Sequence, residues 1–167
     1  MKHVLALIHW FGPFELDKVI GSEWGAKKGL YLITGKQKGD RVANIQYCGK
    51  TEYQTYAKRL GRHHRAHFIT REREIWLGLL PSVSDEELSY YLDKSEKLLT
   101  YYLEPTINKK NTRTIPSPIT LISYWFKSSG EEREKRIYLA QQGIDDVISW
   151  NGEVFRTSNL RITNNDE

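Results

Sequence analysis

The chain has a single cysteine, Cys48, among its 167 residues, which excludes an internal disulfide and any zinc site built from cysteines. A lone cysteine fits a reducing compartment, so we expect a cytoplasmic protein with Cys48 buried. Long apolar runs are missing too: the longest, residues 4–8, cannot cross a bilayer, and no membrane partner is expected. No small-residue cleavage site follows this run, so the start is interpreted as mature sequence.

Internal repeats, low-complexity linkers, zinc-knuckle spacings, a helix-turn-helix pattern and a separate specificity domain are also lacking. A chain of 167 residues suits one domain, long enough to bury a core but short for two. We therefore expect a single domain over residues 1–167 that carries no dedicated module for reading a nucleotide sequence.

Charge is modest in sum, at +4, but it is unevenly distributed. Residues 50–73 carry seven basic side chains against two acidic ones, together with three of the five histidines. Such a stretch is typical of a surface that binds a phosphate backbone, although a bare charge run is more often a solvated face. The candidate backbone contacts are Arg62, Arg65, Arg71, Lys109, Lys110 and Arg113.

Four stretches have the composition of strands. Residues 29–34 and 44–50 are rich in β-branched and aromatic residues and flank a polar, turn-rich interval, which predicts an antiparallel hairpin. The runs 4–11 and 73–80 predict a first and a third strand. The hairpin places Tyr31 and Tyr47 side by side.

Two helices are predicted around these strands. Thr51 with Gln54 three residues later is a capping-box pattern, which predicts a helix with Tyr53 among its inward residues. A second capping box at residues 84–87 predicts a long helix to residue 103, where Glu96 falls inside the apolar stripe. A carboxylate there is costly unless it is paired or binds a cation. Asp93 is interpreted as solvent-facing.

Further along, residues 119–127 alternate like a strand, residues 131–142 predict a helix, and residues 149–154 predict a hairpin through an Asn-Gly turn. The fold class that follows is α+β. We expect a three-stranded antiparallel sheet flanked by helices, with N-terminal and C-terminal additions at its edges.

Two residue triplets in the predicted hairpin resemble the signature of a known protein family. Gly29-Leu30-Tyr31 and Tyr47-Cys48-Gly49 resemble the signature of the GIY-YIG nuclease family, with Leu30 and Cys48 in place of isoleucines. Lys50, directly after the second triplet, matches a lysine found there in the excision-repair members of the family. Both replacements keep an apolar side chain.

Spacings downstream extend the resemblance over roughly residues 27–110. Arg59 and His63 are four apart, and Glu96 lies nine residues before Pro105 and twelve before Asn108, as in the family. Arg59 lies about two residues further from the tyrosine triplet than in many relatives. This departure leaves Arg62 as a rival for its role.

The resemblance implies a nuclease core at about residues 27–115, a C-terminal extension at about 116–167, and metal-dependent endonucleolytic cleavage of DNA. It implies one Mg²⁺ or Mn²⁺ ion per active site, held by Glu96. It also implies that one tyrosine takes the proton of the attacking water while the other positions the phosphate or the water. Which tyrosine does which stays open. The resemblance also implies roles for two further residues: His63 relays a proton or holds the phosphate, and Asn108 positions the end of the glutamate's helix or the metal waters. The implied catalytic residues are Tyr31, Tyr47, Lys50, Arg59, His63, Glu96 and Asn108.

The same residues make chemical sense without the family. Arg59 offers a planar fork to a phosphate, and one carboxylate with waters and a substrate phosphate commonly holds Mg²⁺. Because ionising a phenol of pKa near 10 at pH 7 costs about 4 kcal/mol, we expect cations around the tyrosines.

Two other functions fit this sequence. One is a catalytically silent nucleic-acid-binding module, and the other is a nuclease that cleaves RNA. Each of these residues, taken singly, also has a purely structural interpretation. Tyr31 and Tyr47 would pack at the edge of the core, Lys50 would be a charge at the end of a strand, and Asn108 would be a turn residue. Cutting both strands of a duplex would usually take two active sites, which a homodimer would supply.

Overall fold

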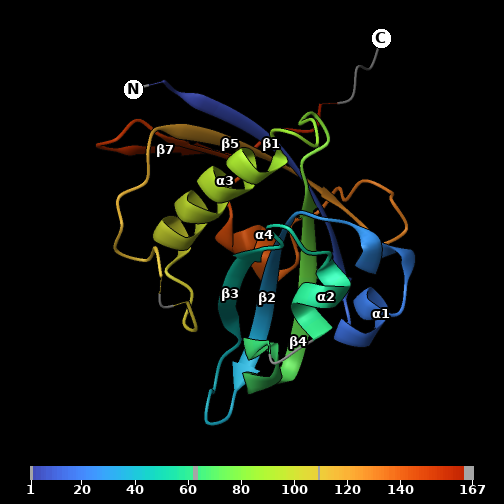
Figure 1. Ribbon diagram of the computed structural model, residues 1–167. Helices are drawn as coiled ribbons and strands as arrows, with labels where there is room; N and C mark the ends of the chain where they lie inside the picture. The colour runs from blue at the N-terminus through green and yellow to red at the C-terminus, as the bar shows by residue number, and fades with distance from the viewer. Residues whose placement is uncertain (1, 62–63, 109, 164–167) are drawn as a thin grey trace.

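The computed structural model describes residues 2–61, 64–108 and 110–163, and these form one curled, mixed sheet with helices on both faces (Figure 1). The seven strands of the described residues have the spatial order β3-β2-β4-β1-β5-β6-β7. Their bounds are β1 Val4–Phe14, β2 Leu30–Gln37, β3 Asn44–Lys50, β4 Ile69–Leu79, β5 Ile119–Phe126, β6 Val147–Trp150 and β7 Phe155–Ser158. The helices are α1 Leu16–Ile20, α2 Tyr56–Gly61, α3 Leu88–Leu103 and α4 Leu139–Gly143, with 3₁₀ turns at Glu23–Ala26 and Arg65–Phe68.

The expected three-stranded antiparallel sheet is wrong as a description of the fold. Strands β3, β2 and β4 do pair antiparallel, but they make only one end of the sheet. Strand β1 pairs antiparallel with β4 and parallel with β5, and β6 and β7 continue the sheet beyond β5. An uncovered β4 would leave a row of unpaired backbone groups, and β1 satisfies them. The terminal segments are therefore strands of the same sheet rather than additions at its edges.

Each face of the sheet has its own apolar cluster. On one face, α3 and α4 pack against β1, β2, β3 and β5 through residues such as Leu92, Leu99 and Ala140. On the other face, α1 and α2 cover β2 and β4 through Val19 and Leu60. Strand β3 lies at the end of the sheet, between α3 on one side and α2 on the other (Figure 1).

The predicted helix start at Thr51 is wrong. Helix α2 begins at Tyr56, and the Thr51 hydroxyl accepts a hydrogen bond from the Gly29 backbone N–H, 3.1 Å away, instead of capping a helix. Residues 52–54 are therefore left in a turn, and Tyr53, predicted to face inward, is 84% exposed. The long helix α3 likewise starts at Leu88, after a turn at residues 85–87.

Predictions for the tail are mixed. The strand at 119–127 and the hairpin around the Asn-Gly turn are confirmed as β5 and as β6 with β7. The helix at 131–142 is wrong over its first two thirds, because α4 covers only Leu139–Gly143. The Arg133 guanidinium lies over the rings of Trp76 and Tyr138 and donates to the Gly12 carbonyl, which holds this segment against the sheet.

In the ranges that the structure describes, every helix is too short or too polar to cross a membrane.

Candidate active site

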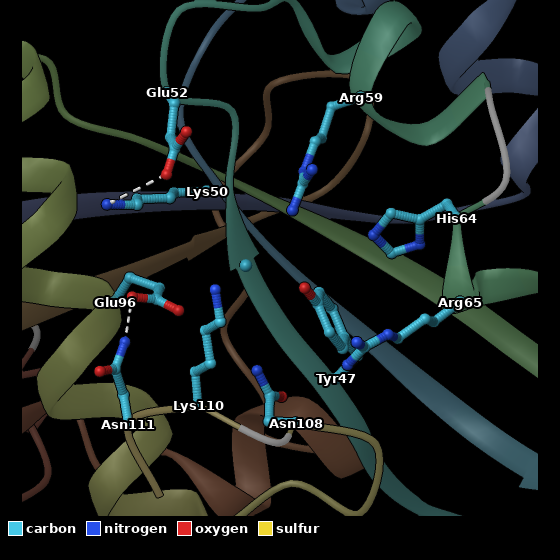
Figure 2. Close-up of a pocket in the computed structure, with 11 residues that line it drawn as sticks. Tyr47, Lys50, Glu52, Arg59, His64, Arg65, Glu96, Asn108, Lys110 and Asn111 are labelled. Atoms are coloured by element: carbon cyan, nitrogen blue, oxygen red, sulfur yellow. Dashed lines mark hydrogen bonds and ion pairs between the residues drawn. The ribbon is translucent and has the colours of Figure 1, made fainter. Parts of the chain in front are cut away.

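A cavity of about 520 Å³ lies beside the end of β3, between α3 and the α2 side of the sheet (Figure 2). The side chains of Tyr47, Arg59, Glu96 and Lys110 point toward the same space. The lining is predominantly polar and cationic: Tyr47, Gly49, Lys50, Glu52, Arg59, His64, Arg65, Glu96, Asn108, Lys110 and Asn111.

The two tyrosines lie side by side, as the hairpin predicted. Their ring centroids are 5.8 Å apart with an angle of 25° between the planes. Gly49 makes this stack possible, because a Cβ at that position would fall 2.5 Å from the Tyr31 ring and 2.8 Å from the Tyr47 ring. The glycine of the second triplet is therefore required by the close approach of both phenols to β3.

The two phenols differ in their surroundings. Tyr31 is fully buried behind the cavity, whereas Tyr47 is half-buried and lines it. The Tyr31 hydroxyl lies 2.8 Å from His64 Nε2 and accepts a hydrogen bond from Arg59 Nε at 3.3 Å. Burial and the neighbouring Tyr47 raise the pKa of Tyr31 well above its usual value, although Arg59 opposes the shift.

His64 has a defined tautomer in its neutral form. The Ala66 backbone N–H donates to His64 Nδ1 at 2.9 Å, so the ring proton sits on Nε2 and is donated to Tyr31. Burial and the nearby charges of Arg59, His67 and Arg65 lower the pKa of His64 from 6.5 to about 4. The ring is therefore neutral at physiological pH.

This lowered pKa predicts a pH-dependent stability. Between pH 6.5 and 4 the unfolded chain binds a proton at residue 64 that the folded chain does not, so stability falls as the pH falls through this window. A shift of this size corresponds to at most about 3 kcal/mol. His64→Gln retains a donor toward Tyr31 but does not titrate. Denaturant melts should show the wild type losing more stability than the variant between pH 7 and pH 4, and parallel curves would contradict the assignment.

Helix α3 supplies the opposite wall. Its buried residues Leu92, Leu98 and Leu99 pack into the core and fix Glu96 half-buried, facing the cavity. Among the described residues the Glu96 carboxylate has only long contacts, 3.3 Å from Asn111 Nδ2 and 3.5 Å from the Thr100 hydroxyl. Burial raises the pKa of Glu96, and Lys50 opposes the shift. A carboxylate in this state has lone pairs left to bind a cation.

Lys50 is held by carboxylates other than Glu96. Its Nζ atom lies 2.7 Å from Asp93 and 3.5 Å from Glu52, and Asp93 also pairs with Lys97 at 2.8 Å. Burial lowers the pKa of Lys50, but the hydrogen bond and charge of Asp93 outweigh it and the net shift is upward. The interpretation of Asp93 as a solvent-facing charge was therefore incomplete, because Asp93 fixes the position of this cation.

Asn108 joins the segment after α3 to the free edge of β3. Its Oδ1 accepts from the Cys48 backbone N–H and its Nδ2 donates to the Cys48 carbonyl, both at 2.8 Å. The Ile107 N–H also donates to the Gln46 carbonyl at 2.8 Å. The Asn108 amide thus satisfies the backbone groups of Cys48 as a neighbouring strand would. Lys110 and Asn111, which follow in the chain, line the cavity.

Asn108→Asp is expected to destabilise the fold. A carboxylate in place of the amide puts an acceptor against the Cys48 carbonyl and leaves that carbonyl without its donor, which costs about 1–3 kcal/mol. Denaturant unfolding measures this loss. Asn44→Asp is the matched control, because the exposed Asn44 side chain accepts from the Thr106 hydroxyl at 3.4 Å and a carboxylate accepts as well. Equal stabilities of the two variants would rule out the proposed pairing.

The predicted site residues have separate outcomes. Tyr47, Lys50, Arg59, Glu96 and Asn108 line one cavity, together with Arg65 and Lys110, while Tyr31 lies behind it. Arg71 instead donates to the carbonyls of Gln37 and Asp40 and holds the β2–β3 loop, and Arg113 is exposed on the segment after the cavity. Three predicted residues lie outside the described residues: Arg62, His63 and Lys109.

Sequence reasoning missed His64, Glu52 and Asn111. The four-residue spacing from Arg59 favoured His63, but His64 has an extended backbone, with φ −70° and ψ 144°, and contacts Tyr31 from the turn after α2. The three adjacent polar residues at 62–64 are the only signal in the sequence, and they do not distinguish between the two histidines.

A divalent ion fits the donor set of this cavity. Among the described residues no three His, Cys, Asp or Glu side chains come together, so a cage built by protein alone is not formed there. Mg²⁺ is commonly held by one or two carboxylates with waters and substrate phosphates. Glu96 is half-buried, its hydrogen bonds within the described part of the chain are long, and it would hold the ion from the α3 side.

Comparisons of the chain with protein-family models, with curated proteins and with solved structures find no match.

Proposed function

We propose that the protein is a GIY-YIG-type endonuclease that uses a divalent metal ion to hydrolyse DNA phosphodiester bonds. The observation that supports this most is one cavity that gathers a half-buried carboxylate, a phenol and several cations. Cations favour the phosphate, and the carboxylate favours the metal ion. The resemblance of the two tyrosine triplets adds to the same proposal.

In this proposal the scissile phosphate lies between Arg59 and Lys110, whose charges stabilise the negative charge that develops in the transition state. Arg59 presents a planar fork to two phosphate oxygens. When bound at Glu96, the metal ion supplies positive charge to the phosphate and to the leaving oxygen. Lys50, fixed by Asp93, adds a further positive charge at the cavity wall.

The phenols take different roles. Tyr47 lines the cavity and, as the phenolate, accepts the proton of the attacking water. Tyr31 is buried and holds Arg59 and His64 through its hydroxyl, so it acts as a positioning residue. Substrate contact by Tyr31 would require the cavity to open behind Tyr47.

The test is cleavage of matched DNA and RNA oligonucleotides, single-stranded and duplex, by the purified protein with Mg²⁺, Mn²⁺ or EDTA. The proposal expects internal cuts in DNA that require the metal. Cuts in RNA alone would favour the RNA-cleaving alternative, for which the same residues serve. No cleavage of any substrate would contradict an enzymatic function. Activity on DNA, with the buried thiol of Cys48, fits a cytoplasmic location.

Binding should depend steeply on salt, because Arg65 and Lys110 are exposed at the cavity and offer charges to the backbone rather than to bases. Replacing both by glutamine should reduce the slope of log K against log salt by about 2. Fluorescence anisotropy in EDTA measures this slope. Arg71→Gln is the matched control, because Arg71 donates both of its hydrogen bonds to the β2–β3 loop and does not line the cavity, whereas Arg65 lines it and makes one bond, to the Ile107 carbonyl. Equal slopes in all variants would refute the assignment.

A further inference from the structure

An amide lies directly beside the Glu96 carboxylate in the cavity wall. Asn111 Nδ2 donates to Glu96 Oε2 at 3.3 Å, and both residues line the cavity (Figure 2). Within the described ranges this is the one side-chain hydrogen bond of Asn111, so its Oδ1 atom has no protein partner there. Amide oxygens are among the ligands that hard divalent cations bind. Asn111 therefore brings a second oxygen ligand next to Glu96.

The other carboxylate and amide groups of the cavity lining have partners of their own. Asn108 uses both ends of its amide on the Cys48 backbone. Glu52 is mostly exposed and pairs with Lys50 at 3.5 Å. Among the lining residues that the structure describes, Asn111 is therefore the side chain best placed to share an ion with Glu96.

The spacing of the two side chains suits two ligands of one ion. Mg²⁺ takes its ligands at about 2.1 Å in octahedral geometry, so two adjacent ligand oxygens lie about 3 Å apart. The 3.3 Å between the amide end and the carboxylate oxygen is close to this separation. The two ends of an amide have nearly the same shape, so a half-turn of the amide puts Oδ1 where Nδ2 lies. This exchange gives up only one long hydrogen bond.

The neutral charge of the amide also suits a site for phosphate. Lys50, Arg59 and Lys110 line the cavity and attract a phosphate group. A second carboxylate on the ion would offset part of this attraction, since opposite charges at close range cancel. An amide oxygen holds the ion and leaves the positive charge of the site intact.

We propose that Asn111 is a second protein ligand of the divalent ion and binds it through Oδ1, beside the Glu96 carboxylate. This inference rests on the proposed function for the presence of the ion and deepens it. The competing role of Asn111 is to donate to Glu96 and hold the carboxylate in place. The two roles differ in one measurable way, because a lost ligand is replaced by a water on the ion and a lost donor is not.

The backbone of Asn111 decides which variants are informative. Its φ is 66°, in the left-handed region that asparagine, aspartate and glycine adopt more readily than other residues. Alanine there would add strain to the loss of the amide. Asn111→Gly removes the amide and tolerates this backbone, whereas Asn111→Asp keeps an oxygen that can ligate but loses the N–H donor.

The test is Mn²⁺ binding to the full chain in the presence of an oligonucleotide with an uncleavable phosphate analogue. The electron paramagnetic resonance signal of the free ion gives the affinity, and water-proton relaxation counts the waters on the bound ion. Asn111→Gly should bind Mn²⁺ at least about tenfold more weakly and carry one more water on the ion. Asn111→Asp should bind at least as tightly as the wild type, with the same number of waters.

Thr100→Val is the matched control, because it removes the other donor to Glu96, 3.5 Å away, from a residue that does not line the cavity. Its Mn²⁺ affinity should stay within about threefold of the wild type, and its water count should not change. An unchanged water count in Asn111→Gly, or equal weakening in Asn111→Gly and Asn111→Asp, overturns the inference alone. Absence of Mn²⁺ binding in the wild type overturns both the inference and the proposed function. If the ion binds as expected and no substrate is cleaved, the proposed function alone fails.

Discussion

Glu96→Gln is expected to reduce cleavage at least about a thousandfold, because it removes the charge that would hold the metal ion while preserving the shape of the side chain. Rates should be measured under single-turnover conditions, so that product release does not obscure the effect. Nucleic-acid affinity measured in EDTA should stay within a few-fold of the wild type, since the backbone contacts come from cations on other elements.

Unfolding does not account for this expected loss. Burial raises the pKa of Glu96, so the charged carboxylate costs the folded state free energy at neutral pH, and a neutral glutamine relieves that cost. The melting temperature of the variant should therefore equal or exceed that of the wild type. Glu52→Gln is the matched control, because Glu52 lines the same cavity but is largely exposed and pairs with Lys50. Equal losses from both variants would contradict the special role of Glu96.

Tyr47→Phe is expected to lower the cleavage rate by about 10²–10⁴-fold with little change in stability, because it deletes the hydroxyl that faces the cavity. Tyr31→Phe should behave differently. It removes the acceptor of His64 and Arg59 and leaves the His64 N–H buried without a partner, which costs about 1–3 kcal/mol of stability.

Single-turnover rates and denaturant melts on both variants separate these roles. Tyr47→Phe should show the larger effect on rate and Tyr31→Phe the larger effect on stability. If Tyr31→Phe instead gives the larger loss in rate while its melt is unchanged, the two phenols have been assigned the wrong way round. His64→Gln, which keeps a donor toward Tyr31, should retain more activity than His64→Ala.

Local pattern was enough to predict part of the site. Alternating and β-branched residues identified the hairpin that stacks Tyr31 on Tyr47, and helical spacing placed Glu96 in an inward stripe. Both features depend on residues close in the sequence, where the strand period of two and the helix period of 3.6 apply. The close approach of Gly49 to both rings follows from the same hairpin register.

Pairing between distant segments could not be predicted in this way. Strand β1 was recognised as a buried strand, but its neighbours β4 and β5 lie far along the chain, and its parallel register with β5 leaves no local signature. The number of strands in the sheet was therefore underestimated. The helix start predicted at Thr51 was wrong for a related reason. The Thr51 hydroxyl accepts a hydrogen bond from the Gly29 N–H of another segment and so does not cap a helix.

In the candidate site, too, local features could be predicted from the sequence and contacts between distant segments could not. Asn108 was found by its spacing from Glu96, but its partner is the backbone of Cys48, which only the folded chain brings near. His64 contacts Tyr31 from the position just before the 3₁₀ turn Arg65–Phe68, and helical spacing from Arg59 does not describe that position. Asp93 holds Lys50 across two elements, again beyond any local pattern.

We propose above all that Glu96 holds one divalent ion in this cavity beside a phosphate. Titration of Mn²⁺, followed by the electron paramagnetic resonance signal of the free ion, tests it directly in the presence of a single-stranded oligonucleotide that contains an uncleavable phosphate analogue. The account predicts one bound ion per chain in the wild type and in Glu52→Gln, and none in Glu96→Gln. Equal ion binding in the wild type and Glu96→Gln, or no binding to either, would contradict it.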